Sequence, residues 1–469
     1  MAIPADPASL NPLAQTGLIE AGAYLNVYET LLSAVPGGPP APLLAESVTA
    51  LDPTTWGVRL RPGVSFQNGE AFDAESVKYS VDTALDPANA SPIRAQLQSI
   101  QGVEVVGDHA VRITTREPFA PLPAELSTLA MLPPRHATAV GLKGLETAPV
   151  GTGPYRLERR VADERLEFRA HAGYWGPAPS AERAELVVLP DGATRVLALL
   201  AGEVDVATGL TPEAAATAGA SGLRVTSAPG IQSLYLRLHA RRPPLDDVRV
   251  RRAIGLAIDV QAIIREIYGG HARPLGAPFP EDVMPFEAAE APPFEPDTAR
   301  RLIVEAGMDP SVPIVLEAPR GRYPRGEDVA QVVSGYLGAI GLTVETRLLE
   351  WGTYLQKVSA GQGEHLFLLA GTNRTYDPHF TLARLYGNGS VFGREYYGSP
   401  TIDGPIAEAA ATLEPTVRQG RYGAILAQLR ADVPAIWLAQ LNDLVAYRPP
   451  VRGSLASDGL TLLSRIGLE

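Results

Sequence analysis

The sequence predicts an α/β protein with two lobes and an additional α+β sub-domain. Two series of alternating strands and helices, separated by more than a hundred residues, indicate the two lobes. A stretch of short alternating strands before the first series indicates the sub-domain. A chain of 469 residues has room for all three parts, because a domain takes ~150 residues.

The α+β sub-domain comes first along the chain. Apolar and polar residues alternate over 56–60, 103–106 and 111–115, as they do in half-buried strands. Between these segments a helix is expected from Asp73 to Leu85. Short strands around one helix, without regular strand–helix alternation, are typical of an α+β arrangement.

The first strand–helix–strand series covers residues 185–210. A β-rich segment, 185–189, is followed by Asp191, which is placed to cap a helix, and the chain then passes Gly202 into a second strand at 204–206. The helix between the strands carries Val196, Leu199 and Leu200. The series therefore forms one βαβ-like unit.

The second series is longer and begins with a strand at 314–316. A strand at 342–348, a short helix at 351–358 and an apolar strand at 366–369 complete a βαβαβ pattern, whose strands right-handed crossovers place in parallel. The first helix ends at Gly341, and its apolar residues are spaced at three and four, as one buried face requires. These residues are Val329, Val332, Val333, Tyr336, Leu337 and Ile340.

The second series also indicates where a ligand binds. Ligands of open α/β sheets bind beyond the carboxyl ends of the strands. Here those ends meet loops such as 371–380. We therefore expect the binding site in the cleft between the two lobes.

Charge and composition exclude several classes of protein. The formal net charge is −12 and no basic run is present, so no nucleic-acid partner is expected. The chain has no cysteine, which excludes a disulfide framework, a thiolate metal site and a cysteine nucleophile. No apolar run approaches the ~18 residues of a membrane span, and the segment Met1–Pro4 lacks the features of a signal peptide.

The sequence contains no motif of a known catalytic centre. The motifs G-x-S-x-G and H-E-x-x-H, a P-loop and paired metal-ligand spacings are all absent, and the seven histidines are scattered. Gly151-Thr152-Gly153 precedes Pro154 and Tyr155, which do not open a phosphate-binding helix, so a tight structural turn is expected there. We expect no enzyme activity, no cofactor and no metal site.

Several segments occur in an order that is typical of one protein family. They are Leu10-Asn11-Pro12, Val27-Tyr28-Glu29-Thr30-Leu31-Leu32, Leu60-Arg61-Pro62-Gly63-Val64-Ser65-Phe66-Gln67-Asn68-Gly69-Glu70, Phe72-Asp73-Ala74-Glu75, Pro149-Val150-Gly151-Thr152-Gly153-Pro154-Tyr155, Tyr174-Trp175 and Pro244-Leu245-Asp246-Asp247-Val248-Arg249-Val250-Arg251-Arg252-Ala253. In these segments the chain resembles the family 5 extracellular solute-binding proteins, which include dipeptide-, oligopeptide- and nickel-binding members. The resemblance extends over nearly the whole chain.

The resemblance implies a bilobed periplasmic-binding-protein fold of type II, similar to cluster C, with an extra α+β sub-domain. Lobe 1 is expected to combine residues 1–41, 149–240 and 440–469, the sub-domain to cover 42–148, and lobe 2 to cover 241–439. The resemblance also implies export, with the leader absent from this sequence. The expected location is extracytoplasmic, in the periplasm or at the cell surface.

The resemblance further implies that the chain is the substrate-binding protein of an ABC importer. In such proteins a small solute is captured between the lobes by hinge closure and delivered to the membrane permease. Peptide-like and opine-like molecules and metal chelates are the expected ligands, and the protein is expected to be a monomer. Two other classes remain open: a ligand-sensing receptor subunit for a chemotaxis or regulatory partner, and a cryptic hydrolase.

The residues expected to contact the solute also follow from the resemblance. One lobe contributes a loop near the start of the chain, and the other contributes the loop after the strand 366–369 and a segment before Gly398. Tyrosine suits such a site, because its rigid ring ends in a hydroxyl group. The residues are Thr16, Gly17, Leu18, Thr372, Asn373, Arg374, Tyr376, Arg394, Tyr396 and Tyr397.

Two interpretations of Tyr376-Asp377-Pro378-His379 stay open. The nickel-binding branch of the family has a similar segment in its cleft loop, but a tryptophan expected near Thr372 is absent here. In the other interpretation Asp377 and Pro378 form a turn and His379 packs beneath it.

Arg374 lies at the position where peptide-binding members carry an acidic residue that receives the amino group of the peptide. A cation in a low-dielectric cleft repels an ammonium group and favours a carboxylate or a phosphate. We therefore expect a ligand with an anionic group.

Overall fold

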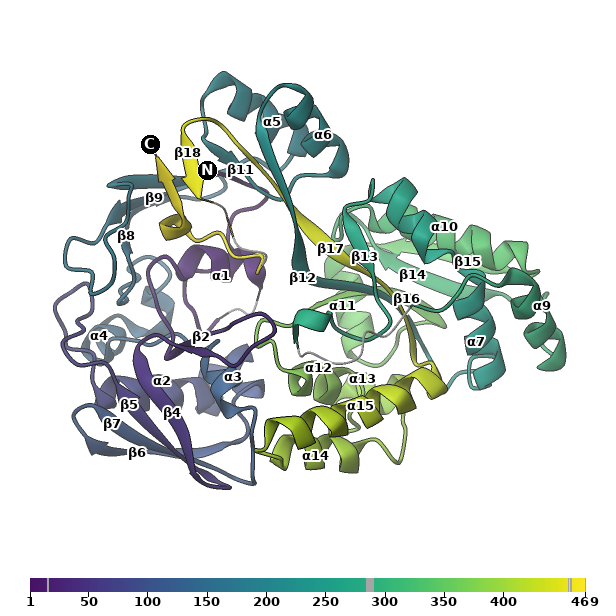
Figure 1. Ribbon diagram of the computed structural model, residues 1–469, viewed down its shortest axis with the longest axis horizontal. Helices are drawn as coiled ribbons and strands as arrows, with labels where there is room; N and C mark the ends of the chain where they lie inside the picture. Colours follow the sequence, from purple (N-terminus) through teal and green to yellow (C-terminus); the bar gives the residue numbers. More distant parts are fainter. Residues whose placement is uncertain (15–16, 284–290, 454, 456–457, 469) are drawn as a thin grey trace. The chain divides into compact units, whose positions relative to one another are not determined.

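The computed structural model describes residues 1–14, 17–283, 291–453, 455 and 458–468. The chain divides into two compact units, residues 1–228 with 443–469 and residues 229–442. Two long strands, β12 (Arg224–Leu238) and β17 (Ala435–Tyr447), carry the chain from one unit to the other (Figure 1). The predicted α/β class is confirmed.

The sheet of the first unit contains the predicted βαβ series. β10 (Arg183–Val188) and β11 (Val206–Ala207) both pair in parallel with the short strand β1 (Ala2–Ile3), which lies between them. The side chain of Asp191 accepts a 2.8 Å hydrogen bond from the amide of Thr194 and caps α5 (Gly192–Ala201), as expected. On the other side of β10, β9 (Arg165–Ala170) and β8 (Tyr155–Val161) extend the sheet antiparallel.

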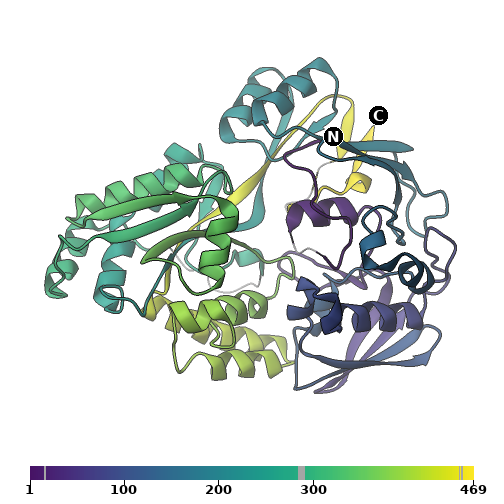
Figure 2. The ribbon, with the colours of Figure 1, turned by 180° about the vertical axis from the view of Figure 1, so that it is seen from behind.

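The expected α+β sub-domain contains a four-stranded antiparallel sheet in the order β4 (Ala45–Asp52), β5 (Thr55–Leu60), β7 (Ala110–Thr115) and β6 (Ile100–Gly107). The helix α2 (Ala74–Leu85) begins at Asp73, which forms a capping box with Ser76. α2 lies along one face of this sheet (Figure 2). The predicted short strands and the predicted helix are present, and α3 (Leu122–Leu126) and α4 (Pro134–Gly144) lie in the same stretch of the chain.

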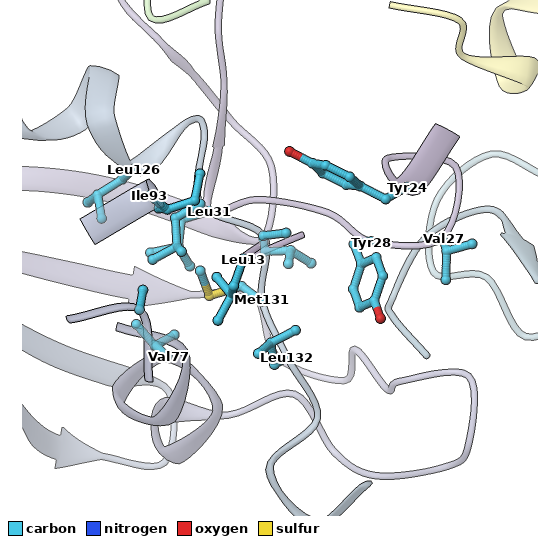
Figure 3. Packing of buried hydrophobic residues seen from close by; sticks show 14 of the residues in the cluster. Leu13, Tyr24, Val27, Tyr28, Leu31, Val77, Ile93, Leu126, Met131 and Leu132 are labelled. Atoms are coloured by element: carbon cyan, nitrogen blue, oxygen red, sulfur yellow. The ribbon is translucent and has the colours of Figure 1, made fainter. Parts of the chain in front are cut away.

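The core of this sub-domain is continuous with the N-terminal segment of the chain. Leu13, Tyr28 and Leu31 belong to the same buried cluster as Val77 and Met131, as Figure 3 shows. The shared core explains why residues 42–148 lie within the first compact unit rather than forming a separate one.

The sheet of the second unit contains the predicted βαβαβ series. β14 (Ile314–Pro319) pairs in parallel with both β15 (Val344–Leu349) and β16 (Leu366–Thr372), and β12 pairs antiparallel with β16. The crossover helices are α10 (Gly326–Ala339) and α11 (Trp351–Ser359). The predicted buried face of α10 is correct for Val329, Val333 and Leu337, whereas Val332 is 37% exposed.

The remaining elements complete the two units. Asp247 caps α7 (Val248–Ala257) and Asp259 caps α8 (Val260–Ala262). No helix in the described part of the chain has both the length and the apolar character that crossing a membrane requires. Other bounds are α1 (Leu18–Tyr24), β2 (Leu32–Ser33), β3 (Ala41–Pro42), α3 (Leu122–Leu126), α4 (Pro134–Gly144), α6 (Pro212–Ala220), α7 (Val248–Ala257), α8 (Val260–Ala262), β13 (Ala272–Pro274), α9 (Pro296–Glu305), α12 (Pro378–Leu385), α13 (Val391–Tyr396), α14 (Asp403–Ala411), α15 (Pro415–Asp432), β18 (Val451–Gly453) and β19 (Ile466–Leu468).

The division between the units falls inside the two long strands. The first unit ends at residue 228 and resumes at 443, whereas the expected lobe boundaries are at 240 and 440. The first part of β12 and the last part of β17 belong to the first unit, while the remainder of each strand belongs to the second. A strand that continues from one unit into the other has no linker segment that marks a boundary in the sequence.

Candidate functional site

Three of the sequence segments that resemble the family meet at Glu29 in the first unit. The Glu29 carboxylate accepts hydrogen bonds of 2.8 Å from the Thr152 hydroxyl, the Tyr174 hydroxyl and the Trp175 indole. Burial raises the pKa of Glu29, and these three donors oppose the rise. Because the carboxylate is fully engaged inside the fold, this cluster positions backbone segments and offers little to a ligand.

The turn Gly151-Thr152-Gly153 packs directly against the backbone of this cluster. A Cβ atom at Gly151 would lie 2.1 Å from the carbonyl oxygen of Val27, and one at Gly153 would lie 2.7 Å from the same atom. The side-chain amide of Gln67 donates to the carbonyl oxygens of Gly153 and Tyr155. The expected structural turn fits these contacts, since only glycine allows so close an approach.

The loop between β16 and α12 is held by the buried side chain of Asn373. Its amide nitrogen donates to the Asp377 carbonyl oxygen at 2.8 Å and to the Thr381 hydroxyl, and its amide oxygen accepts from the Thr375 hydroxyl at 2.6 Å. The backbone of Tyr376 is left-handed, with φ at 50°, which costs a residue with a Cβ atom free energy. The loop thus holds one unusual conformation, as binding loops often do.

Asp377 is engaged by a buried arginine. One guanidinium nitrogen of Arg418 lies 2.7 Å and 2.6 Å from the two carboxylate oxygens of Asp377, and it also bonds the Tyr422 hydroxyl at 2.9 Å. The Asp377 carboxylate additionally accepts from the amide of His379 and caps α12. Its negative charge is therefore compensated within the second unit.

The other candidates in this loop differ in exposure. Thr372 ends β16 and is half-buried, Arg374 is half-buried in the turn, and Tyr376 is buried. Burial lowers the pKa of His379 to about 4, so its ring is neutral near pH 7. Among the described residues, no three His, Asp and Glu side chains gather where they could hold a metal ion.

The two tyrosines expected near Gly398 are not on an exposed loop. Tyr396 is fully buried in α13, where its hydroxyl accepts from the amide of Gly363 and donates to the Val358 carbonyl oxygen, both at 2.8 Å. Tyr397 is 8% exposed and donates to Asp432. Both are buried because their segment forms a helix that is capped by Ser390 and packs on the core. Arg394 is exposed and pairs with Glu395 at 2.9 Å.

The candidates from the N-terminal loop lie at the start of α1. Gly17 is the N-cap residue and Leu18 is the first residue of the helix. Thr16 lies outside the described residues.

A pocket of about 120 Å³ lies beside α1 in the first unit. Apolar side chains from several elements form much of its wall, namely Ile3, Ile19, Leu186, Val445 and Leu455. Asp443 from β17 is the one charged residue among the described residues that line it. Its Oδ2 atom is buried and has no hydrogen-bond partner among the described residues.

Burial raises the pKa of Asp443 to about 6, and the nearby charge of Asp458 adds to the rise. The backbone N–H of Gly459 opposes it by donating to the carboxylate. Asp458 itself is bound by the guanidinium of Arg465, at 2.8 Å and 2.7 Å. Asp443 is thus a carboxylate in an apolar pocket, with a single donor among the described residues.

Sequence reasoning missed Asp443 and the pair Asp377–Arg418. For Asp443 a signal was present, since an aspartate stands in the mostly apolar segment 435–447 that returns to the first unit. Arg418 lies far from Asp377 in the chain, in a helix with many polar residues, so no local pattern pointed to the pair.

Comparison with known proteins decides the family. The profile described as "Bacterial extracellular solute-binding proteins, family 5 Middle" matches residues 39–393. The chain belongs to this family. This family 5 protein is 28% identical over 459 residues to the di/tripeptide-binding protein 2 of Pseudomonas aeruginosa. The matched residues cover 91% of this chain and 86% of the relative.

Two further relatives show the range within family 5. The glutathione-binding protein GsiB of Pectobacterium atrosepticum is 28% identical over 400 residues, which cover 83% of this chain and 77% of that protein. The crystal structure of NikA from Brucella suis in complex with Fe(III)-EDTA superposes with a TM-score of 0.88 at 25% identity, covering 100% of this chain and 99% of that one. The predicted bilobed binding-protein fold is thereby confirmed.

Proposed function

We propose that this chain captures a small peptide-like solute with an anionic group and delivers it to the permease of an ABC importer. The observation that carries the proposal is the family membership over residues 39–393. The similarity to a di/tripeptide-binding protein and to a glutathione-binding protein supports a peptide-like ligand. In the proposed cycle the solute favours a closed arrangement of the two units by binding it more tightly.

The anionic group follows from the charges of the β16–α12 loop. The carboxylate of Asp377 is already paired with Arg418, so it is a poor receptor for the amino group of a peptide. Arg374 is the other charged side chain that the loop contributes between Thr372 and Asp377, and it is half-buried. A guanidinium group there suits a carboxylate, which it can bind through two parallel hydrogen bonds.

A metal chelate is the second candidate ligand. NikA of Brucella suis, whose fold is similar, was crystallised with Fe(III)-EDTA. A chelate that brings its own carboxylates needs few ligands from the protein, and its negative charge would also suit Arg374. The missing tryptophan near Thr372 argues against this candidate.

The remaining parts of the proposal follow from the family. We place the protein outside the cytoplasm, in the periplasm or at the cell surface, as a monomer whose macromolecular partners are the permease subunits. We propose no catalytic role for it. A sensing role with a chemotaxis or regulatory partner is the alternative, and it would use the same ligand site.

Titration calorimetry with glutathione, the dipeptide Ala-Leu and Fe(III)-EDTA tests the proposal. Arg374→Ala should weaken binding of the anionic ligand by ~2 to 5 kcal/mol, the usual cost of removing one side of a buried charged pair, and Arg374→Asp should weaken it further. Arg301→Ala removes an exposed arginine of α9 in the same unit and is the matched control.

The outcomes separate the candidates. Binding of Fe(III)-EDTA alone would replace the peptide-like ligand by a chelate. Unchanged affinity in both Arg374 variants would remove this residue from the site. Small-angle scattering with the tightest ligand should show compaction, and an unchanged radius of gyration at saturation would contradict closure.

A further inference from the structure

We propose that the pocket beside α1 is a subsite for a protonated amine of the ligand, with Asp443 as its counter-charge. The inference rests on the proposed function and makes its ligand more specific. The ligand of the proposed function carries an anionic group, so with this amine it would be a zwitterion.

The state of the Asp443 carboxylate supports an amine subsite. Its Oδ2 atom is buried without a partner among the described residues, and the nearby charge of Asp458 is negative as well. Burying an unpaired carboxylate is costly, and a ligand ammonium group would supply the missing positive charge. The raised pKa of about 6 expresses the same lack of a partner.

The chemistry of the pocket wall also suits an ammonium group. None of the described lining residues is Lys, Arg or His, so no cation among them competes for Asp443. The hydroxyl groups of Thr208 and Thr226 donate to the backbone oxygens of Ala2 and Val445, which leaves lone pairs on both threonine oxygens. Asp443, Thr208 and Thr226 therefore offer acceptors, and an ammonium group has three donors to match them.

The volume of the pocket beside α1 fits the amine end of a small ligand. A pocket of about 120 Å³ has room for several non-hydrogen atoms, because ~10–15 Å³ of such space holds one water. The pocket is therefore large enough for a terminal aminoalkyl group. Its apolar walls also lower the local dielectric, which strengthens the attraction between the carboxylate and an ammonium ion.

The test compares the dipeptide Ala-Leu with N-acetyl-Ala-Leu by titration calorimetry at about pH 7.5. We expect the wild-type protein to prefer the free amine by about 10- to 100-fold, the range for a hydrogen bond between charged groups. Asp443→Asn keeps the size of the side chain and removes its charge, so the preference should disappear. Glu104→Gln removes an exposed carboxylate from β6 in the same unit and should leave the preference unchanged.

The results distinguish failure of the amine subsite from failure of the proposed peptide-binding function. Equal affinity for both peptides in the wild type, or a preference that persists in Asp443→Asn, would overturn the amine subsite while the peptide-binding function stands. If neither Ala-Leu nor glutathione binds, the peptide-like ligand itself is refuted, and the amine subsite with it. Circular dichroism of Asp443→Asn confirms that the variant is folded.

Discussion

Glu29 and Asp443 are two carboxylates of the same unit whose surroundings differ. Glu29 accepts hydrogen bonds from three side-chain donors and joins segments that are far apart in the sequence. Asp443 receives one backbone N–H from Gly459, and one of its oxygens is buried without a described partner. Burial alone therefore does not show whether a carboxylate has a structural role or binds a ligand. The number of hydrogen-bond donors around it distinguishes the two roles.

The largest effect is expected at Glu29. Glu29→Ala would leave the donors of Thr152, Tyr174 and Trp175 without their acceptor, and each unsatisfied buried donor costs roughly 1 to 3 kcal/mol. We expect the free energy of unfolding to fall by about 3 to 5 kcal/mol in urea titrations. A loss below about 1 kcal/mol would show that the cluster relaxes easily and would break the contrast with Asp443.

A smaller effect of opposite sign is expected for Asp443→Asn. The pKa of Asp443 rises from 3.8 to about 6 on folding, so the folded protein holds this proton more tightly than the unfolded chain. Stability is therefore lost as the pH rises through the folded pKa. At about pH 7.5 the variant should be more stable than the wild type by roughly 3 kcal/mol, and below about pH 4 the two should be equal.

Thermal melts of both proteins over this pH range measure the difference directly. If Asp443→Asn destabilises the protein at high pH, the carboxylate has a partner that stabilises it. A difference that does not change with pH would mean that Asp443 titrates normally. Either result would place Asp443 with Glu29 as a structural residue.

The smallest effect is expected for Glu104→Gln, which compares an exposed carboxylate with the buried carboxylates of Glu29 and Asp443. Glu104 pairs with Arg112 at 2.6 Å, but its side chain is 65% exposed. Exposed ion pairs contribute little, so the free energy of unfolding should change by no more than about 0.5 kcal/mol. A larger change would mean that net charge, rather than local environment, governs the two buried sites.

The elements that follow a local pattern were predictable from the sequence. The βαβαβ series of the second unit and the caps at Asp73, Asp191 and Asp247 depend on spacing and on short-range hydrogen bonds, both of which are visible in a single sequence. The order of the segments that resemble family 5 was also visible in the sequence. Their meeting point at Glu29 was not, because it depends on contacts between distant parts of the chain.

The candidate site was less predictable. Burial of Tyr396 depends on Phe367 and His239, which pack against its ring from distant segments. The compensation of Asp377 by Arg418 depends on the packing of α15. Exposure and pairing are tertiary properties, so the roles of Tyr396 and Asp377 could not be read from their neighbours in the chain.

The interrupted first unit has a consequence for synthesis of the protein. Residues 1–228 leave the ribosome well before residues 443–469, which belong to the same unit. Until β17 arrives, β11 has no antiparallel neighbour on one side, and the pocket lacks Asp443 and Val445. The second unit is continuous in sequence, but its core includes Ile436, Leu438 and Leu441 of β17, so it also stays incomplete until this strand arrives. A nascent chain that stops short of β17 therefore carries the β16–α12 loop but cannot form the pocket beside α1.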